Sequence, residues 1–356
     1  MVPTLLGLSL LFSFLVTERM RHYGPKWHLM DIPNPRSSHS LPTPRAGGIG
    51  IVFTVLIAVP FLAFQNLLGW NFVAALVGGG GLVALIGFVD DRVHLCARTR
   101  IVAHFVAAGW ALYWLRGIPA IQVGSISWAW GWPGNLAVLV GMVWLVNLYN
   151  FMDGIDGIAG VEAVCAAGVG ALLLASHHFS GLAVVAAVMA TSSAGFLLWN
   201  WPPARIFMGD GSSGFLGFAF GLLIVASTRK EGSLLWAWLI LLLVFIVDSA
   251  VTLLRRFLGG ARWYEAHCSH TYQHASRRWG SLKVIRVVAG LNVAWLLPLA
   301  WAAMVWSRLG LMFTLIAAFP LVLLAFHFRA GCAEASRTEA SAAALRPGGA
   351  LRWRSR

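Results

Sequence analysis

Residues 134–157 read GNLAVLVGMVWLVNLYNFMDGIDG, an apolar run that ends in a cluster of asparagine, aspartate and glycine. The same alternation of an apolar run and a polar cluster recurs along the chain. Lipid cannot satisfy an exposed backbone amide, and a helix satisfies its own amides internally. The pattern therefore predicts α-helices packed as a bundle inside a membrane.

Eleven apolar runs predict eleven transmembrane helices in one domain, residues 1–328. A spanning helix needs about 20 mostly apolar residues, and 59% of the 356 residues are apolar against 11% charged, which excludes a water-soluble surface. The first run lacks a small-residue cleavage pattern and predicts a retained helix. The runs centre near 3–17, 47–66, 71–89, 101–116, 134–149, 157–176, 182–199, 212–227, 234–254, 288–306 and 311–328.

Basic residues gather on one side of the predicted bundle. The segments after the odd-numbered runs and the tail 329–356 contain 22 of the 26 lysines and arginines. Cytoplasmic loops hold such an excess, so we expect the N-terminus outside and the C-terminus in the cytoplasm. This distribution explains the net charge of +13 without nucleic acid, and we expect a disordered tail near anionic lipid. The predicted cytoplasmic loops are 17–46, 90–100, 150–156, 200–211 and 255–287.

Most unusual polar clusters lie in these loops, as expected if the loops converge on one site. Asp90 and Asp91 close an apolar run and repel each other, which predicts a bound cation or one protonated carboxyl. Mg²⁺ prefers carboxylates, phosphate oxygens and retained waters, so Mg²⁺, with Mn²⁺ as the alternative, is the predicted cofactor. Asp90, Asp91 and Asp210 are the predicted catalytic residues. The predicted metal ligands are Asp91, Asp153, Asp156 and Asp210.

Each acidic motif also has a simple structural interpretation. Asp90-Asp91 could be a solvated helix end, Asp153-Gly-x-Asp156-Gly a pair of turns, and Asp210 a helix cap. Asn147 and Asn150 lie one helical turn apart before the turns, which favours a site over two incidental turns. The predicted substrate contacts from these loops are Arg36, His39, Asn147, Asn150, Asp153, Asp156 and Arg205.

The most basic loop contains His267, His270 and His274, spaced to share a helical face. Neighbouring arginines favour an anionic substrate, so His267, His270 and His274 are predicted substrate contacts, and zinc stays open as an alternative ligand. Asp248 lies inside the ninth run, where an ionisable group is costly, and is expected to have a structural or gating role. The four cysteines contain no C-x-x-C pair and predict neither a disulfide framework nor a cysteine metal site.

Five stretches together resemble the polyprenyl-phosphate N-acetylhexosamine-1-phosphate transferases, over about residues 31–280. They are DIPNPRSSHSLPTPRAGG, GFVDD, NLYNFMDGIDG, NWPPARIFMGD and the histidine loop, in the order that this family shows. The resemblance implies that Asp90 and Asp91 match the family's aspartate pair and Asp153 and Asp156 its second acidic motif. Asp210 matches the aspartate that holds its metal, and Asn147 and Asn150 match its asparagines.

The resemblance implies transfer of a sugar 1-phosphate from a UDP-N-acetylhexosamine to undecaprenyl phosphate, with release of UMP. The site would lie on the cytoplasmic face of a bacterial inner membrane, and a homodimer is left open. Two motifs depart from the family: Gly209-Asp-Gly-Ser-Ser213 in place of Gly-Asp-x-Gly-Ser, and His270-Thr-Tyr-Gln-His274 in place of His-x-His-His. The second departure concerns which donor sugar is used, because the resemblance implies that this loop recognises the hexosamine. EAHCSHTYQHASR is similar to the O-antigen-initiating enzymes that use N-acetylfucosamine or N-acetylquinovosamine.

Two other classes of membrane protein compete with a transferase. An intramembrane aspartyl protease needs two aspartates facing each other within helices, whereas most acidic residues here lie in loop-like segments. A cation transporter would favour intramembrane carboxylates or broken helices related by a repeat, and the sequence contains no repeat. Formation of UMP in detergent would separate a transferase from a transporter.

Overall fold

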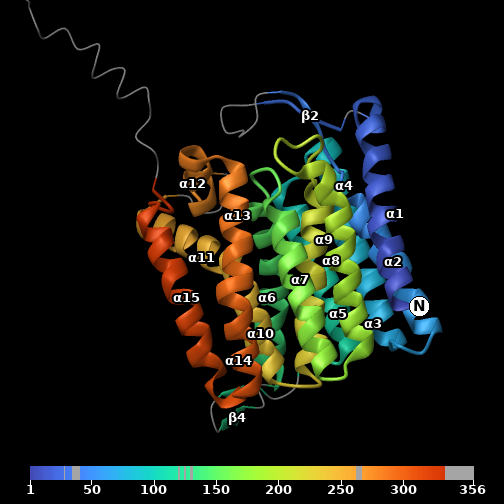
Figure 1. Ribbon diagram of the computed structural model, residues 1–356, viewed down its shortest axis with the longest axis vertical. Helices are drawn as coiled ribbons and strands as arrows, with labels where there is room; N and C mark the ends of the chain where they lie inside the picture. Colours follow the sequence, from blue (N-terminus) through green and yellow to red (C-terminus); the bar gives the residue numbers. More distant parts are fainter. Residues whose placement is uncertain are drawn as a thin grey trace, which may run out of the picture.

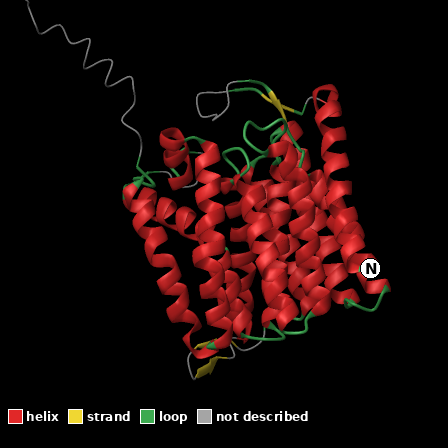
Figure 2. Ribbon diagram, in the orientation of Figure 1, coloured by secondary structure: helices red, strands yellow, loops and turns green. Residues whose placement is uncertain are grey.

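The computed structural model describes residues 1–27, 29–33, 41–118, 121–123, 126–128, 131–261 and 267–332. Over these residues the chain is a bundle of long helices with two short antiparallel ribbons (Figures 1 and 2). The N-terminal half contains α1 Val2–Tyr23, η1 Gly24–Trp27, β1 Met30–Asp31, β2 Thr43–Pro44, α2 Ile49–Phe64, α3 Trp70–Ala74, η2 Ala75–Gly80, α4 Gly81–Val93, α5 Ala97–Leu115, β3 Ile121–Val123, β4 Ile126–Trp128 and α6 Gly131–Met152. The C-terminal half contains α7 Ile158–Ser176, α8 Ser180–Asn200, α9 Asp210–Thr228, α10 Ser233–Leu241, α11 Leu243–Leu258, α12 Thr271–Trp279, α13 Ser281–Leu291, η3 Asn292–Leu296, α14 Leu297–Val305, η4 Ser307–Leu309 and α15 Gly310–His327.

The protein is an all-α polytopic membrane protein. Within the described residues, eight helical segments are long and apolar enough to cross a membrane, or up to nine if α10 and α11 count as one span bent by 71°. Every predicted run overlaps a helix, but α2, with 16 residues, and α5 fall outside this set. The eleven spans and their orientation stay predictions.

The helices extend beyond the apolar runs into the predicted loops. α1 continues through Arg19 and Arg21 to Tyr23, and α4 continues to Val93. Asp90 and Asp91 therefore lie in the last turn of a helix and not in a loop. The predicted loop 255–287 contains all of α12 and the start of α13. Polar residues can occupy a helix end because water and headgroups solvate them there, so the apolar run underestimates the helix.

Helix α9 forms the centre of the bundle. Every one of its residues after Asp210 is buried, as expected for a helix that is apolar on all sides. Gly211 and Gly217 allow close approach, because a β-carbon would meet the backbone of α4 at Gly211 and of α6 at Gly217. These crossings bring the polar ends of α4 and α6 to the start of α9.

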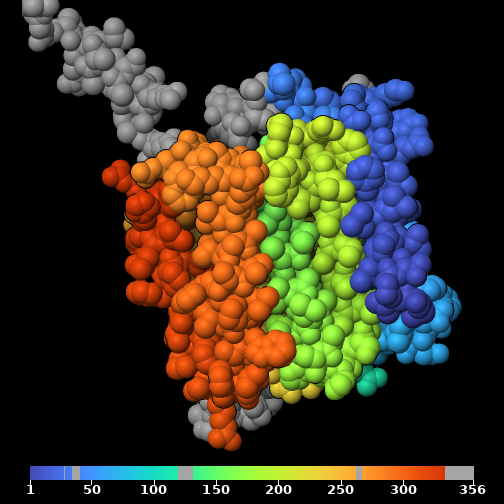
Figure 3. All heavy atoms as spheres, viewed as in Figure 1, coloured from blue at the N-terminus to red at the C-terminus, as the bar shows by residue number. Residues whose placement is uncertain are grey.

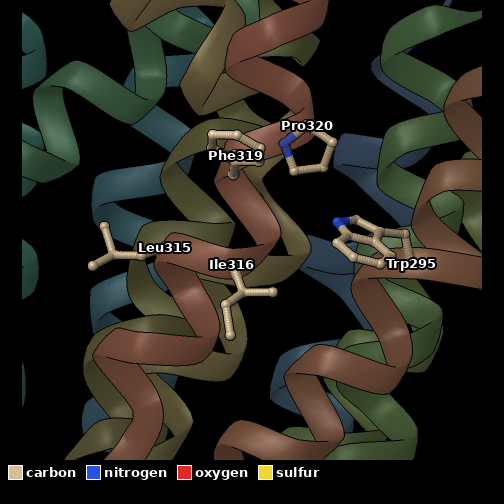
Figure 4. Close-up of a pocket in the computed structure, with 5 residues that line it drawn as sticks. All are labelled: Trp295, Leu315, Ile316, Phe319 and Pro320. Carbon is tan, nitrogen blue, oxygen red and sulfur yellow. The ribbon is translucent and has the colours of Figure 1, made fainter.

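One end of the bundle carries the β1–β2 ribbon and α12, and the other carries β4 and the α14–α15 turn (Figure 1). In the face shown in Figure 3, α7 and α8 lie between α1 on one side and α13 on the other. A shallow apolar cavity of about 450 Å³ lies between η3 and α15 (Figure 4). It is lined by Trp295, Leu315, Ile316, Phe319 and Pro320 and contains none of the predicted site residues.

Candidate active site

The α4–α9 crossing brings together three of the predicted aspartates. A side chain at Gly87 would collide with the backbone of Gly211, so the two helices touch there. At this crossing the Asp210 backbone N–H donates to Asp91 Oδ1 at 3.1 Å. Gly209, with φ of +85°, is the N-cap of α9, and Asp210 is the first residue of the helix. Asp210 is therefore not the helix cap that its position in the sequence suggested.

Arg100 links Asp90 to Asp210. Its Nη1 lies 2.7 Å from Asp90 Oδ2 and 3.8 Å from Asp210 Oδ2. The other oxygen of Asp90 accepts from the Leu95 backbone N–H at 2.6 Å. Both oxygens of Asp90 thus have partners, and the side chain is 7% exposed. This arrangement favours an orienting role for Asp90.

Arg45 approaches the aspartates from the β1–β2 ribbon. Its guanidinium lies 3.9 Å from Asp91 Oδ1 and 3.5 Å from Asp31 Oδ2. Backbone hydrogen bonds from Gly47 N–H to Phe207 and from Phe207 N–H to Pro44, each 2.8 Å, join this segment to the loop before α9. Two segments more than 150 residues apart in sequence therefore form one wall of the site. Arg36 and His39 lie outside the described residues.

Asp91 offers an unused carboxylate oxygen. Its side chain is 1% exposed, and Oδ2 is buried and accepts no hydrogen bond from any described residue. A buried, unpaired carboxylate oxygen is costly. It needs a proton or a cation.

The loop 153–157 places the second acidic motif beside these groups. Burial first, and then the charge of Asp210, raise the pKa of Asp153 well above the usual range of a carboxyl, while Arg45 acts in the opposite direction. Asp156 is used differently, because its Oδ2 accepts from the Ala204 backbone N–H at 3.0 Å. Asp153 is thus the member of the motif that the Asp91–Asp210 pair influences, and Asp156 holds the loop that precedes α9.

The two predicted asparagines occupy different places on α6. Asn150 Nδ2 donates to Ser213 Oγ on α9 at 3.2 Å, at the start of the helix that begins with Asp210. Asn147 Nδ2 donates to the Val143 carbonyl at 2.7 Å and lies 3.4 Å from His104 Nδ1 on α5. Asn150 therefore belongs to the aspartate cluster, whereas Asn147 faces α5.

The histidines do not form one shared face. His270 is 2% exposed and its Nδ1 lies 3.2 Å from Asp248 Oδ1. His267 lies before α12, with its ring 4.9 Å from that of His270 and its Nδ1 3.1 Å from Ser269 Oγ. His274 Nδ1 is 3.1 Å from Arg277 Nη2. His270 is thus a buried partner of Asp248, which agrees with a structural role for Asp248.

Arg205 lies apart from the aspartates in the described contacts. Its side chain is exposed, and its guanidinium carbon is 5.7 Å from the centre of the Trp199 ring. Arg100 was not among the predicted site residues. Its signal in the sequence was only its place ten residues after Asp90, at the start of the next helix.

A divalent cation fits part of this donor set. Among the described residues no three His, Cys, Asp or Glu side chains already stand as a metal-binding group. The buried Oδ2 of Asp91, which has no hydrogen-bond partner among these residues, is the oxygen of this set that could coordinate a hard cation. Asp153 and Asp210 are the other carboxylates of this cluster, since the charges of Asp210 and Asp91 both act on Asp153, and the predicted metal ligands stay a prediction.

The fold and site define a polytopic membrane protein with a charge-paired cluster of carboxylates and arginines at one end of its bundle. The model of glycosyl transferase family 4 matches residues 73–228, which contain Asp90, Asp153 and Asp210. The phospho-N-acetylmuramoyl-pentapeptide-transferase of Moorella thermoacetica is 31% identical over 60% of this chain and 67% of its own length. The chain belongs to glycosyl transferase family 4.

Two further relatives carry related names. The undecaprenyl-phosphate alpha-N-acetylglucosaminyl 1-phosphate transferase of Thermotoga maritima is 27% identical over 80% of this chain and 85% of its own length. The decaprenyl-phosphate N-acetylglucosaminephosphotransferase of Mycolicibacterium smegmatis is 30% identical over 64% of this chain. The chain spans 60% of the length of that mycobacterial relative.

Proposed function

We propose that this protein transfers an N-acetylhexosamine 1-phosphate from a UDP-sugar to undecaprenyl phosphate and releases UMP. The observation that carries the proposal is the convergence of three acidic segments and two arginines at one end of the bundle. Such a cluster suits a reaction in which two phosphate-bearing substrates must meet. Membership of family 4 and the names of the relatives support a polyprenyl phosphate acceptor and an N-acetylhexosamine donor.

In the proposed reaction an oxygen of the lipid phosphate attacks the β-phosphorus of the donor. The new P–O bond forms as the bond from that phosphorus to the oxygen bridging to the α-phosphate breaks, so the sugar keeps its C1–O bond and UMP leaves. An ionised phosphate monoester is already nucleophilic at neutral pH, so positioning contributes more than proton removal. Arg100, fixed by Asp90, and Arg45 would donate to phosphate oxygens. Asn150 would help to hold the start of α9.

Asp91, Asp153 and Asp210 would hold the proposed Mg²⁺. When bound, the cation supplies charge neutralisation for the phosphates and helps to align the displacement. Asp156 would support the site through the 200–206 loop, since its carboxylate is already bonded to Ala204.

The location follows from the same proposal. The end with the β1–β2 ribbon and α12 would face the cytoplasm of a bacterial inner membrane, where nucleotide sugars are made. The excess of basic residues in its loops supports this orientation. The product would start a lipid-linked glycan such as O-antigen, and anionic lipid would contact the basic end.

Purified protein in detergent, given undecaprenyl phosphate and a panel of UDP-sugars, tests the proposal. We expect UMP and a lipid product whose mass equals the acceptor plus one sugar phosphate. Donors should include UDP-GlcNAc and its N-acetylated 6-deoxy relatives. UDP release instead of UMP would contradict the reaction, because it would mean that the sugar moves without its phosphate.

A further inference from the structure

Asp248 lies at the centre of a buried network that joins α11 to α12. It follows the 71° bend between α10 and α11 and is 6% exposed. Its Oδ1 accepts from the Thr271 backbone N–H at 2.9 Å, and its Oδ2 accepts from the Tyr272 backbone N–H at 3.0 Å. The His270 ring and the Thr252 hydroxyl also lie within 3.2 Å of Oδ1. One carboxylate thus satisfies the first amides of α12, which otherwise have no helical partner.

Helix α12 needs this anchor because it contains only nine residues. Isolated helices of this length are marginal. The capping box between His270 and Gln273 closes the same end, with the His270 N–H donating to Gln273 Oε1 at 3.1 Å. Asp248 therefore ties the start of α12 to α11.

Tyr272 extends the network to the acidic loop. Its ring stacks on that of His270, with centroids 5.6 Å apart, and is 4% exposed. Its hydroxyl donates to the Phe151 carbonyl at 2.9 Å. A β-carbon at Gly154 would collide with the same hydroxyl. Tyr272 therefore packs directly on the segment that carries Asp153.

The geometry points to Asp248 and Tyr272 as positioning residues for the transferase site: Asp248 fixes the start of α12, and Tyr272 fixes the 151–157 segment, which carries Asp153, against α12. This inference rests on the proposed function for its catalytic consequence. The docking itself does not depend on the reaction. The loop is thereby tied to the helix that follows His267, so this histidine and the acidic motif are connected by one network.

The first test measures docking without substrate. Hydrogen–deuterium exchange of residues 151–157 should accelerate in Asp248→Asn and in Tyr272→Phe, which keeps the stacked ring but loses the hydroxyl. Ser276→Ala is the matched control on α12, because the Ser276 hydroxyl pairs with that of Ser281 on α13. Unchanged exchange in both variants would overturn the docking. Tyr272→Phe keeps the test valid if Asp248→Asn does not fold.

The second test measures turnover. Tyr272→Phe should lower kcat about 10-fold, since small displacements of aligned groups are costly, while KM for undecaprenyl phosphate stays within about twofold. Gly154→Ala should lower kcat as well, because the new methyl group would collide with the Tyr272 hydroxyl. Tyr272→Phe removes that hydroxyl, so the double variant should lose less kcat than the product of the two single losses. Purely multiplicative effects, or an equal loss in Ser276→Ala, would refute the positioning role. A wild-type protein without transfer would refute the proposed function, and the exchange measurement would still decide on the docking.

Discussion

The guanidinium of Arg100 donates a 2.7 Å hydrogen bond to Asp90 across the turn between α4 and α5. The same nitrogen lies 3.8 Å from Asp210, and the Arg100 side chain is 37% exposed. An arginine that is fixed by one carboxylate and still reaches the surface is well placed to receive a phosphate. Its partner Asp90 is buried, so the Arg100 guanidinium is held in one orientation.

Replacing Arg100 should impair transfer much more than replacing a neighbouring arginine. We expect Arg100→Gln to lower kcat/KM for the donor by about 10- to 100-fold, because a charge-assisted contact to phosphate is lost. Arg100→Lys should retain more of the kcat/KM than Arg100→Gln but less than the wild-type protein, because lysine keeps the charge and loses the planar pair of donors. Arg98→Gln removes an exposed charge of the same helix and is the control. UMP release provides the measurement, and equal losses in both Gln variants would argue against a specific role.

Asp210→Asn should leave a folded membrane protein with at least ~10²-fold less transfer, because a preorganised electrostatic contact commonly contributes on this scale. If Asp210 only stabilised the N-terminus of α9, the change would cost about 0.3–1 kcal/mol of stability and leave turnover intact. Glu18→Gln, which removes a carboxylate charge on α1, is the matched control. Turnover at saturating Mg²⁺ and the melting temperature, measured on both variants, separate these outcomes.

The convergence of the acidic motifs could be predicted from the sequence because alternate loops of a membrane bundle emerge on the same side. Asp91 and Asp210 meet at the α4–α9 crossing as that reasoning requires. The partners inside the site could not be predicted in this way. Arg100 is one of several basic residues near its loop, and nothing in the spacing distinguishes it from Arg98. Its contact with Asp90 depends on the path of the α4–α5 turn.

Asp248 and His270 illustrate the second limit. They are 22 residues apart and lie in different predicted elements, so an apolar run with one aspartate and a basic loop with three histidines gave no reason to pair them. The bend between α10 and α11 brings them together. Helix ends were also misplaced, because hydropathy detects the apolar middle of a helix and not the polar turns at its ends.

His267 and His270 should respond differently to replacement. His267→Ala is expected to raise KM for the UDP-sugar with little change in melting temperature, whereas His270→Ala should also lower the melting temperature, because Asp248 would lose a buried partner. A change in donor use for both variants would match the recognition role predicted for these histidines. Stoichiometric zinc that is lost on either mutation would support the structural-metal alternative instead.

Acid should destabilise the protein partly through His267. Burial first, and then the positive charges of His270 and Arg256, lower the pKa of His267 from 6.5 to about 4. Between pH 6.5 and 4 the unfolded chain therefore binds a proton that the folded chain does not, so the stability from this residue is present above pH 6.5 and is lost as the pH falls toward 4. His267→Gln should flatten this part of a melting-temperature profile measured against the wild-type protein.

The orientation of the bundle can be tested with cysteines at its two ends. Cys96, exposed in the α4–α5 turn, belongs to the end with the aspartates, and Arg308, exposed in the α14–α15 turn, belongs to the other. In a background that keeps only one cysteine at a time, an impermeant maleimide added to intact cells should label Arg308→Cys and spare Cys96. Opening the cells should make Cys96 react, which controls for its accessibility.

This labelling pattern is expected from the excess of lysine and arginine in the loops at the Cys96 end, which opposes the translocation of these loops across the membrane. Labelling of Cys96 from outside intact cells would invert the topology and separate the site from the cytoplasmic pool of nucleotide sugars.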